Sequence, residues 1–187
     1  MDDVTDRARD LLGRVLHGHG VAVRITEVEA YGGTADPASH AFVRTPRSEI
    51  MFGEPWRLYV YTIHGHHAAN VVTGPTDQAA AVLIRAGEVV AGEPVARERR
   101  GAVSFDALAR GPGNLTRALG ISLADLGTDL LDGRPVCLGE RTDVPGISAG
   151  PRVGVRHAAD VPWRFWVTGD PTVSAYRRHP RAGQSSR

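Results

Sequence analysis

Residues 24–40, which read RITEVEAYGGTADPASH, concentrate the side chains best suited to chemistry. The first eight read as a strand, and at strand period one face carries Ile25, Glu27, Glu29 and Tyr31. The strand runs directly into the turn residues Gly32 and Gly33. A core strand would carry apolar side chains where this one carries two carboxylates and a phenol ring. The pattern therefore indicates the wall of a site.

The two carboxylates are separated by one residue, so their backbones lie roughly 6 to 7 Å apart on one strand face. That spacing suits a glycoside-hydrolase pair, and it equally suits one catalytic carboxylate beside a supporting one. Asp36 and His40 follow in a polar loop and add groups that could support general-base catalysis. The alternative is structural, because acidic residues are common on half-exposed strands.

A second group of candidates surrounds Gly65, where His64, His66 and His67 mark the tip of an expected hairpin. His64 and His66 could point one way and bind a metal, but the hairpin offers no Cys, Asp or Glu to complete a ligand set. An exposed polar tip is the reading we favour over a metal site, so no metal is predicted. A third reading is a probe whose rings insert between the bases of a nucleic acid.

The remaining candidates each have a structural alternative. Tyr59 and Tyr61 share a strand face and would pack in the core, unless the substrate has a flat ring on which they can stack. Arg85 is either a solvated strand end or a buried charge that needs a carboxylate partner such as Glu29. The segment RGPGNLTRALG places the start of a helix beside Arg110 and Arg117, which suits a phosphate contact or a plain capped surface helix.

Composition limits the function classes. The 187 residues suit one domain, and the formal net charge of +1 says little about partners. All 22 basic residues are arginine, so no side-chain amine can form a Schiff base. The single cysteine, Cys137, excludes internal disulfides and a cysteine metal cluster, which suits a reducing cytoplasm. No signal peptide is visible, and no window approaches the ~20 apolar residues of a membrane helix.

Periodicity predicts an α+β domain around a curved, mostly antiparallel sheet with short peripheral helices. Helical spacing runs from Val4 to Val15 with Gly13 as its stop, and a second short helix spans 114–119 with Asn114 as its cap. Strands are expected at 21–31, 57–63, 68–73, 80–86, 152–156 and 164–168, with a helical turn at 48–52. The basic residues 177–187 are expected to be disordered.

Several of these segments together resemble one family. The matching stretches are DLLGRVL, ITEVEAYGG with the later SH, TPR with MF, LYVYTIHG, NVVTG, VLIRA, RGPGNLTRALGI, PRVGV and PWRFWV. They occur in the order found in the alkyladenine (3-methyladenine) DNA glycosylase family and extend from about Ala8 to Tyr176. The chain is therefore identified as resembling that family over nearly its whole length.

The resemblance implies a single glycosylase domain over residues 1–176, with an open-barrel-like sheet and a protruding DNA-binding β-hairpin. It implies a monofunctional, monomeric base-excision enzyme without cofactor or lyase activity, acting in the bacterial cytoplasm at the nucleoid. The partner would be double-stranded DNA that contains damaged purines, which are flipped into a pocket. The expected substrates are 3-methyladenine and 7-methylguanine, with hypoxanthine and etheno-adenine as further candidates.

The resemblance also assigns roles to residues. Glu29 would be the catalytic residue that activates the attacking water. Tyr31, His40 and Tyr61 would sandwich the flipped base, Asn70 would be the pocket asparagine, and Arg85 would lie near the water. The DNA-binding residues would be His64 at the intercalating hairpin tip, Gly65, His66, Arg47 and Arg117.

The chemistry of the residues agrees with this assignment. Alkylated purines are cationic or electron-poor, so aromatic faces attract them and the base leaves without a strong general acid. Three departures stand out: His64 replaces a tyrosine, one residue is missing between Gly65 and Asn70, and Asn114 stands where the family often has lysine. Two alternatives remain, a non-catalytic module that binds damaged DNA and a histidine–metal hydrolase that a chelator would inhibit.

Overall fold

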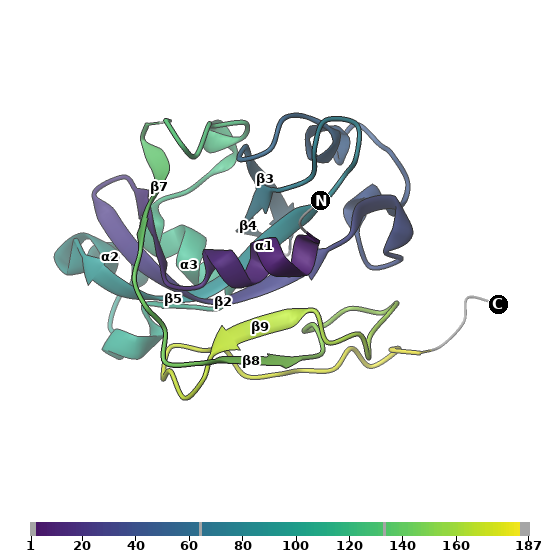
Figure 1. Ribbon diagram of the computed structural model, residues 1–187. Coiled ribbons are helices and arrows are strands. Elements are labelled where there is room, and N and C mark those ends of the chain that lie inside the picture. The colour runs from purple at the N-terminus through teal and green to yellow at the C-terminus, as the bar shows by residue number, and fades with distance from the viewer. Residues whose placement is uncertain (1–2, 64, 133, 184–187) are drawn as a thin grey trace.

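The computed structural model describes residues 3–63, 65–132 and 134–183, and it confirms an α+β domain built on a curled antiparallel sheet (Figure 1). The main path of the sheet runs β3–β4–β5–β2–β1–β7, with β6 paired to β5 and the β8–β9 pair joined to β2. The strands are β1 (Arg14–Gly18), β2 (Val21–Tyr31), β3 (Leu58–Ile63), β4 (His66–Val72), β5 (Ala81–Ala91), β6 (Ala109–Arg110), β7 (Val136–Arg141), β8 (Ile147–Gly150) and β9 (Arg164–Val167). The α-helices are α1 (Val4–Leu11), α2 (Glu93–Arg100) and α3 (Pro112–Leu119).

The two longest strands, β2 and β5, form the centre of the sheet, and each has 11 residues. Both are rich in β-branched and small apolar residues, which suit a strand buried on both faces. In Figure 1, α1 and α3 lie on one side of this pair and β8 and β9 on the other. Apolar side chains of α3 at helical spacing join the main core, among them Leu115, Ala118 and Leu119. The pair is therefore held from both sides, which fixes the end of β2 where the acidic residues lie.

The alternation of side chains along β2 is interrupted. The register against β5 shifts between Ile25 and Glu27 and again between Glu27 and Val28. Ile25 packs in the main core, whereas Glu27 and Glu29 both lie beside Arg85. The expectation that Ile25 shares a face with the two carboxylates is therefore wrong. An irregular pairing changes which side chains point the same way, and the sequence pattern does not reveal it.

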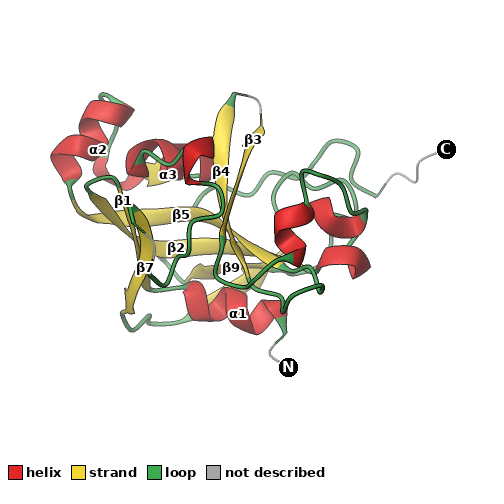
Figure 2. Ribbon diagram, turned by 90° about the horizontal axis from the view of Figure 1, so that it is seen from above, coloured by secondary structure: helices red, strands yellow, loops and turns green. Residues whose placement is uncertain are grey.

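The β3–β4 hairpin projects from the sheet (Figure 2). Its pairing is continuous from Leu58↔Val71 to Ile63↔His66, and Gly65 has a φ of 78° in the connecting turn. His64 lies outside the described residues. The register contains no shift, so Tyr59 pairs with Asn70 and the placement of Asn70 on β4 is regular.

Two expected helix boundaries are wrong. The first helix ends at Leu11, because Leu12 is extended and Gly13 has a φ of 83°, so Val15 belongs to β1. Helix α3 begins at Pro112 after Gly111, which occupies the cap position expected of Asn114. The Asn114 side chain instead donates a hydrogen bond to the carbonyl of Arg110.

Residues 152–156 are turns and loop and do not form the expected strand. Arg152 is 1% exposed and binds Asp36, so this segment is held by side-chain contacts and not by sheet pairing. The chain returns to the sheet at β9, within the strand expected at 164–168. The expected helical turn at 48–52 is a 3-10 helix over Glu49–Phe52.

The described part of the C-terminal segment contacts the loop before β9. The carbonyl of Arg177 accepts a hydrogen bond from Gly154, and Arg178 pairs with Asp160. Disorder of residues 177–187 stays a prediction. Among the described residues, none of the helices combines the length and apolarity that crossing a bilayer requires.

The turn after β2 depends on Gly33, and this generates a test. Gly33 has a φ of 64°, and a Cβ atom there would lie 1.8 Å from the carbonyl oxygen of Ala79. Gly20 also has positive φ, at 86°, but nothing lies within 4 Å of its Cβ position. We expect Gly20→Ala to cost about 1–2 kcal/mol in the free energy of unfolding from backbone strain alone. Gly33→Ala should cost about 1–3 kcal/mol more, because the backbone must also move.

Equilibrium urea unfolding of both variants measures the difference. Equal urea midpoints for Gly33→Ala and Gly20→Ala would show that the close approach of residue 33 to Ala79 does not affect the free energy of unfolding.

Candidate active site

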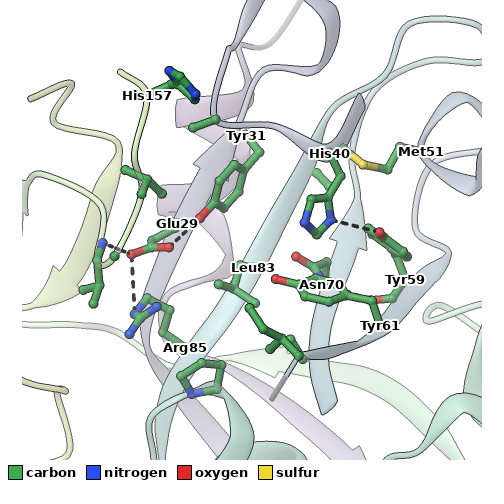
Figure 3. Close-up of a pocket in the computed structure, with 18 of the residues that line it drawn as sticks. Glu29, Tyr31, His40, Met51, Tyr59, Tyr61, Asn70, Leu83, Arg85 and His157 are labelled. Atoms are coloured by element: carbon green, nitrogen blue, oxygen red, sulfur yellow. Dashed lines mark hydrogen bonds and ion pairs between the residues drawn. The ribbon is translucent and has the colours of Figure 1, made fainter. Parts of the chain in front are cut away.

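A cavity of about 320 Å³ opens where β2 ends beside the hairpin (Figure 3). Its volume lies in the range of small-molecule sites. The strands β2, β3, β4 and β5 supply one part of its wall. Residues around 37–40 and 153–157, together with Met51 and Pro112, supply the rest. The cavity brings together all six residues expected to act on the base, namely Glu29, Tyr31, His40, Tyr61, Asn70 and Arg85.

Glu29 is fully buried and its carboxylate is held at both oxygens (Figure 3). Its Oε1 accepts a hydrogen bond of 2.7 Å from the backbone N–H of Val153 and lies 3.5 Å from Nε of Arg85. Its Oε2 accepts a bond of 2.8 Å from the hydroxyl of Tyr31. Donors of this kind offset the cost of burying a carboxylate. A carboxylate oxygen has two lone-pair directions, so Glu29 keeps capacity to bind a water molecule.

Arg85 lies between the two carboxylates of β2. Its Nε donates a bond of 3.1 Å to Oε1 of Glu27, which is closer than Glu29. Burial opposes the charge of this guanidinium, yet Glu29 and Glu27 raise its pKa above the ordinary value. The sequence suggested Glu29 as the carboxylate partner of Arg85. In the structure, Arg85 contacts both Glu29 and Glu27.

Tyr31 forms the wall of the cavity next to Glu29. Burial and the neighbouring carboxylate raise the pKa of Tyr31 well above its ordinary value, so the phenol remains a neutral donor. The guanidinium of Arg152 lies 4.8 Å from the centre of the Tyr31 ring. Arg152 in turn donates to the carbonyl of Ala30 at 3.0 Å and to Asp36 at 2.9 Å. This buried ion pair ties the loop after β2 to the segment that carries the Val153 N–H.

The opposite wall consists of His40, Tyr59 and Tyr61 (Figure 3). The His40 ring meets the Tyr61 ring edge to face at 4.6 Å, and Nδ1 of His40 is 3.0 Å from the hydroxyl of Tyr59. Ser39 caps the 3-10 turn His40–Phe42 by accepting a bond from the N–H of Ala41, which fixes the backbone beneath His40.

The rings of His40 and Tyr61 in this wall are neutral at physiological pH. Burial and then the charge of Arg47 lower the pKa of His40 to about 4, although the residue stands at the exposed mouth of the cavity. Burial, Tyr59 and Glu29 raise the pKa of Tyr61 to about 12. The cavity thus places an anionic carboxylate beside uncharged aromatic rings.

Asn70 and Leu83 face each other across β4 and β5 and line the cavity between its two aromatic walls. Asn70 is 4% exposed, and its amide nitrogen donates to the carbonyl of Tyr59 at 3.1 Å. This bond orients the amide. The unbroken hairpin register keeps Asn70 in the cavity.

The residues expected to contact DNA separate into two surfaces. Gly65, His66 and Arg117 line a groove between the hairpin and α3, where the Cβ position of Gly113 is 3.0 Å from Cβ of His66. Arg47 does not line this groove; it is exposed beside β3, with its guanidinium 4.9 Å from the centre of the Tyr61 ring. His64 lies outside the described residues, so its expected role at the tip stays a prediction.

The strand alternation that Tyr59 shares with Tyr61 identifies both as possible stacking rings, whereas the family resemblance assigns that role to Tyr61 alone. Sequence reasoning missed two contributors to the site. Arg152 lies within PRVGV, but its partner Asp36 is more than a hundred residues away in the chain. The Val153 contribution is a backbone N–H, which no side-chain pattern reveals.

The histidines of the hairpin do not assemble a metal site in the part of the chain that the structure describes. Within residues 3–63, 65–132 and 134–183, no three His, Cys, Asp or Glu side chains are placed to hold a metal ion together. His67 instead has its Nδ1 3.1 Å from the hydroxyl of Thr62 on the facing strand.

Comparison with known proteins agrees with this geometry. The methylpurine-DNA glycosylase family matches residues 1–171. A protein of Nocardia farcinica is 53% identical over 191 residues, covering 96% of this chain and 90% of that protein. A protein of Mycobacterium bovis is 51% identical over 189 residues, which cover 96% of this chain and 93% of that protein. A protein of Mycolicibacterium paratuberculosis is 52% identical over 189 residues, which cover 96% of this chain and 92% of that protein. All three bear the name "Putative 3-methyladenine DNA glycosylase". With a family match over nearly its whole length and a cavity of this construction, the chain belongs to the methylpurine-DNA glycosylases, enzymes that hydrolyse N-glycosyl bonds in DNA.

Proposed function

We propose that this enzyme releases 3-methyladenine from duplex DNA, and with it 7-methylguanine and other N-alkylated purines. The observation that carries the proposal is the buried Glu29 carboxylate at the edge of an aromatic cavity. Hypoxanthine and etheno-adenine are further candidates for the same cavity. They are neutral, so they would gain less from the electrostatics described below.

The cavity suits a flat, cationic base. The rings of Tyr31, His40 and Tyr61 stand on two walls and can stack on a planar ligand from either side (Figure 3). Aromatic faces attract cations, with about 1 kcal/mol or more gained when the pair is desolvated. A protonated histidine would repel such a base, and the lowered pKa of His40 avoids this. Normal purines lack the positive charge, which gives the cavity a basis for selection.

Glu29 supplies the hydrolytic step. Its carboxylate orients a water molecule, whose oxygen bonds to C1′ of the sugar while the bond from C1′ to the purine nitrogen breaks. The departing base takes the bonding electrons, and the water proton passes to Glu29. An alkylated base is neutralised as it leaves, so no strong general acid is needed. The negative charge of Glu29 also stabilises the positive charge that develops on the sugar.

The hairpin and α3 would form the DNA-binding side of this single-domain, monomeric enzyme. With a net charge of only +1, affinity for phosphates must come from local arginines and not from the whole surface. Arg117 in the groove and Arg47 beside Tyr61 are the phosphate contacts we propose, with Gly65 and His66 at the duplex. We infer action in the bacterial cytoplasm at the nucleoid.

Glu29→Gln tests the catalytic assignment. The amide keeps the size of the side chain but cannot accept the water proton, so we expect the single-turnover rate of base release to fall at least about 100-fold. Release of free 3-methyladenine from methylated duplex DNA measures it, and affinity for the same DNA should persist. Glu88→Gln is the matched control, because Glu88 pairs with Arg24 away from the cavity.

The same assay separates the alternatives. Binding of damaged DNA without base release by the wild type would identify a non-catalytic module. Loss of release in a chelator would point to a metal hydrolase. Undiminished release by Glu29→Gln would remove Glu29 from the reaction.

The pKa of His40 provides an independent test of the aromatic wall. Because its pKa is lowered to about 4 in the folded protein, the neutral ring stabilises the fold above the ordinary value of 6.5. That contribution is lost as pH falls from 6.5 towards 4. We expect His40 to titrate by NMR with a midpoint well below 6.5. The rate of base release should therefore show no change between pH 6 and 8 that arises from protonation of His40.

Arg47→Ala should raise that midpoint only in part, since burial is the larger cause and Arg47 the smaller. Arg44→Ala is the control, because Arg44 lies in the same loop but pairs with Glu49. A titration midpoint of His40 at or above 6.5 in the wild type would contradict the inference that the His40 ring is uncharged in the cavity wall.

A further inference from the structure

Glu27 is a buried carboxylate that the mechanism above does not use. It is 0% exposed and accepts four hydrogen bonds, three at Oε1 and one at Oε2. The donors at Oε1 are Nε of Arg85 at 3.1 Å, Nε of Arg164 at 2.6 Å and the hydroxyl of Ser174 at 2.9 Å. The backbone N–H of Ser174 donates to Oε2 at 2.7 Å. Glu27 is not among the residues that line the cavity, so any effect on the reaction must pass through a neighbour.

Arg164 already balances the charge of Glu27. It is fixed independently, because its Nη2 donates to the carbonyl of Ser174 at 2.7 Å and its guanidinium lies 4.6 Å from the centre of the Trp166 ring. Two carboxylates and two guanidiniums thus form a buried group without net charge. Of the two guanidiniums in this group, Arg85 lies within 3.5 Å of both carboxylates, and Arg164 pairs with Glu27.

The position of Arg85 matters for the chemistry of Glu29. At 3.5 Å, the contact between Nε of Arg85 and Oε1 of Glu29 is longer than an ordinary N–H···O bond, whereas the 3.1 Å bond to Glu27 is not. A guanidinium engaged directly with Glu29 would occupy a lone pair and weaken the carboxylate as a base. A guanidinium held slightly away still offsets the cost of burying the charge.

We propose that Glu27 is a positioning residue for base release, which anchors Arg85 so that the carboxylate of Glu29 stays available to the attacking water. The inference rests on the proposed function of Glu29. It assigns a role to the strand face on which both carboxylates lie.

Glu27→Gln is the direct test. The amide removes one negative charge and leaves two guanidiniums beside a single carboxylate, so Arg85 should move onto Glu29. We expect the acid limb of the pH–rate profile for single-turnover base release to move to lower pH by about one unit. The rate at pH 7.5 should fall about tenfold, because a weaker base accepts the water proton less readily.

Two further variants sharpen the test. Glu27→Asp keeps the charge but withdraws the carboxylate from Arg85, so its acid limb should lie between those of the wild type and Glu27→Gln. Glu88→Gln removes a carboxylate from another arginine pair across β2 and β5, and its profile should match the wild type. An equal shift in Glu88→Gln would overturn the specific role of Glu27. Should Glu27→Gln fail to fold, Glu27→Asp decides alone, and an acid limb identical to the wild type overturns the proposal.

A purely structural role predicts a different result. The melting temperature of Glu27→Gln would then drop while the acid limb of the folded enzyme stayed in place, and that outcome would overturn the proposal. An NMR titration of the Glu29 carboxyl carbon separates this failure from failure of the proposed function. If the wild type releases no base, the proposed function fails, yet a shift of the Glu29 titration to lower pH in Glu27→Gln would still show that Glu27 positions Arg85.

Discussion

Two buried carboxylates on a single strand, Glu27 and Glu29, are the constraint around which this molecule is arranged. Burying an unpaired carboxylate costs several kcal/mol, so each must receive charge or hydrogen bonds from elsewhere. Apart from Tyr31 on β2 itself, the donors to Glu27 and Glu29 come from β5, from β9, from Val153 and from Ser174. These segments are far apart in the chain and meet only when the sheet closes around β2. The fold and the charge of the site therefore depend on each other.

Arginine suits this arrangement better than lysine would. A guanidinium presents several donors in one plane and stacks on aromatic rings while it pairs with a carboxylate. Arg152 does both, with Tyr31 and Trp163 within 5.5 Å of its guanidinium and Asp36 bound to it. Arg164 repeats the pattern with Trp166 and Glu27. The site is thus supported by charged groups whose orientation is fixed on more than one side.

Much of the site could be predicted from sequence, and the failures have a common cause. Strand period located the acidic face of β2 and the aromatic strand β3, and family resemblance named the six residues that converge on the cavity. The error at Ile25 arose from a register shift, which depends on the partner strand. The Val153 N–H and the sharing of Arg85 by two carboxylates depend on segments brought together by the whole fold. Local patterns describe side-chain types, whereas these features are set by long-range backbone geometry.

The unbroken register of the hairpin links two ends of the molecule that would otherwise be independent. His66, at the start of β4, and Asn70, inside the cavity, belong to one regular strand. Four residue steps along a strand span about 13 Å, and a paired strand stretches very little. The hairpin is therefore a rigid spacer between His66 and the cavity. Under the function proposed above, this fixed length would set how far a base has to extend from the duplex to reach Glu29.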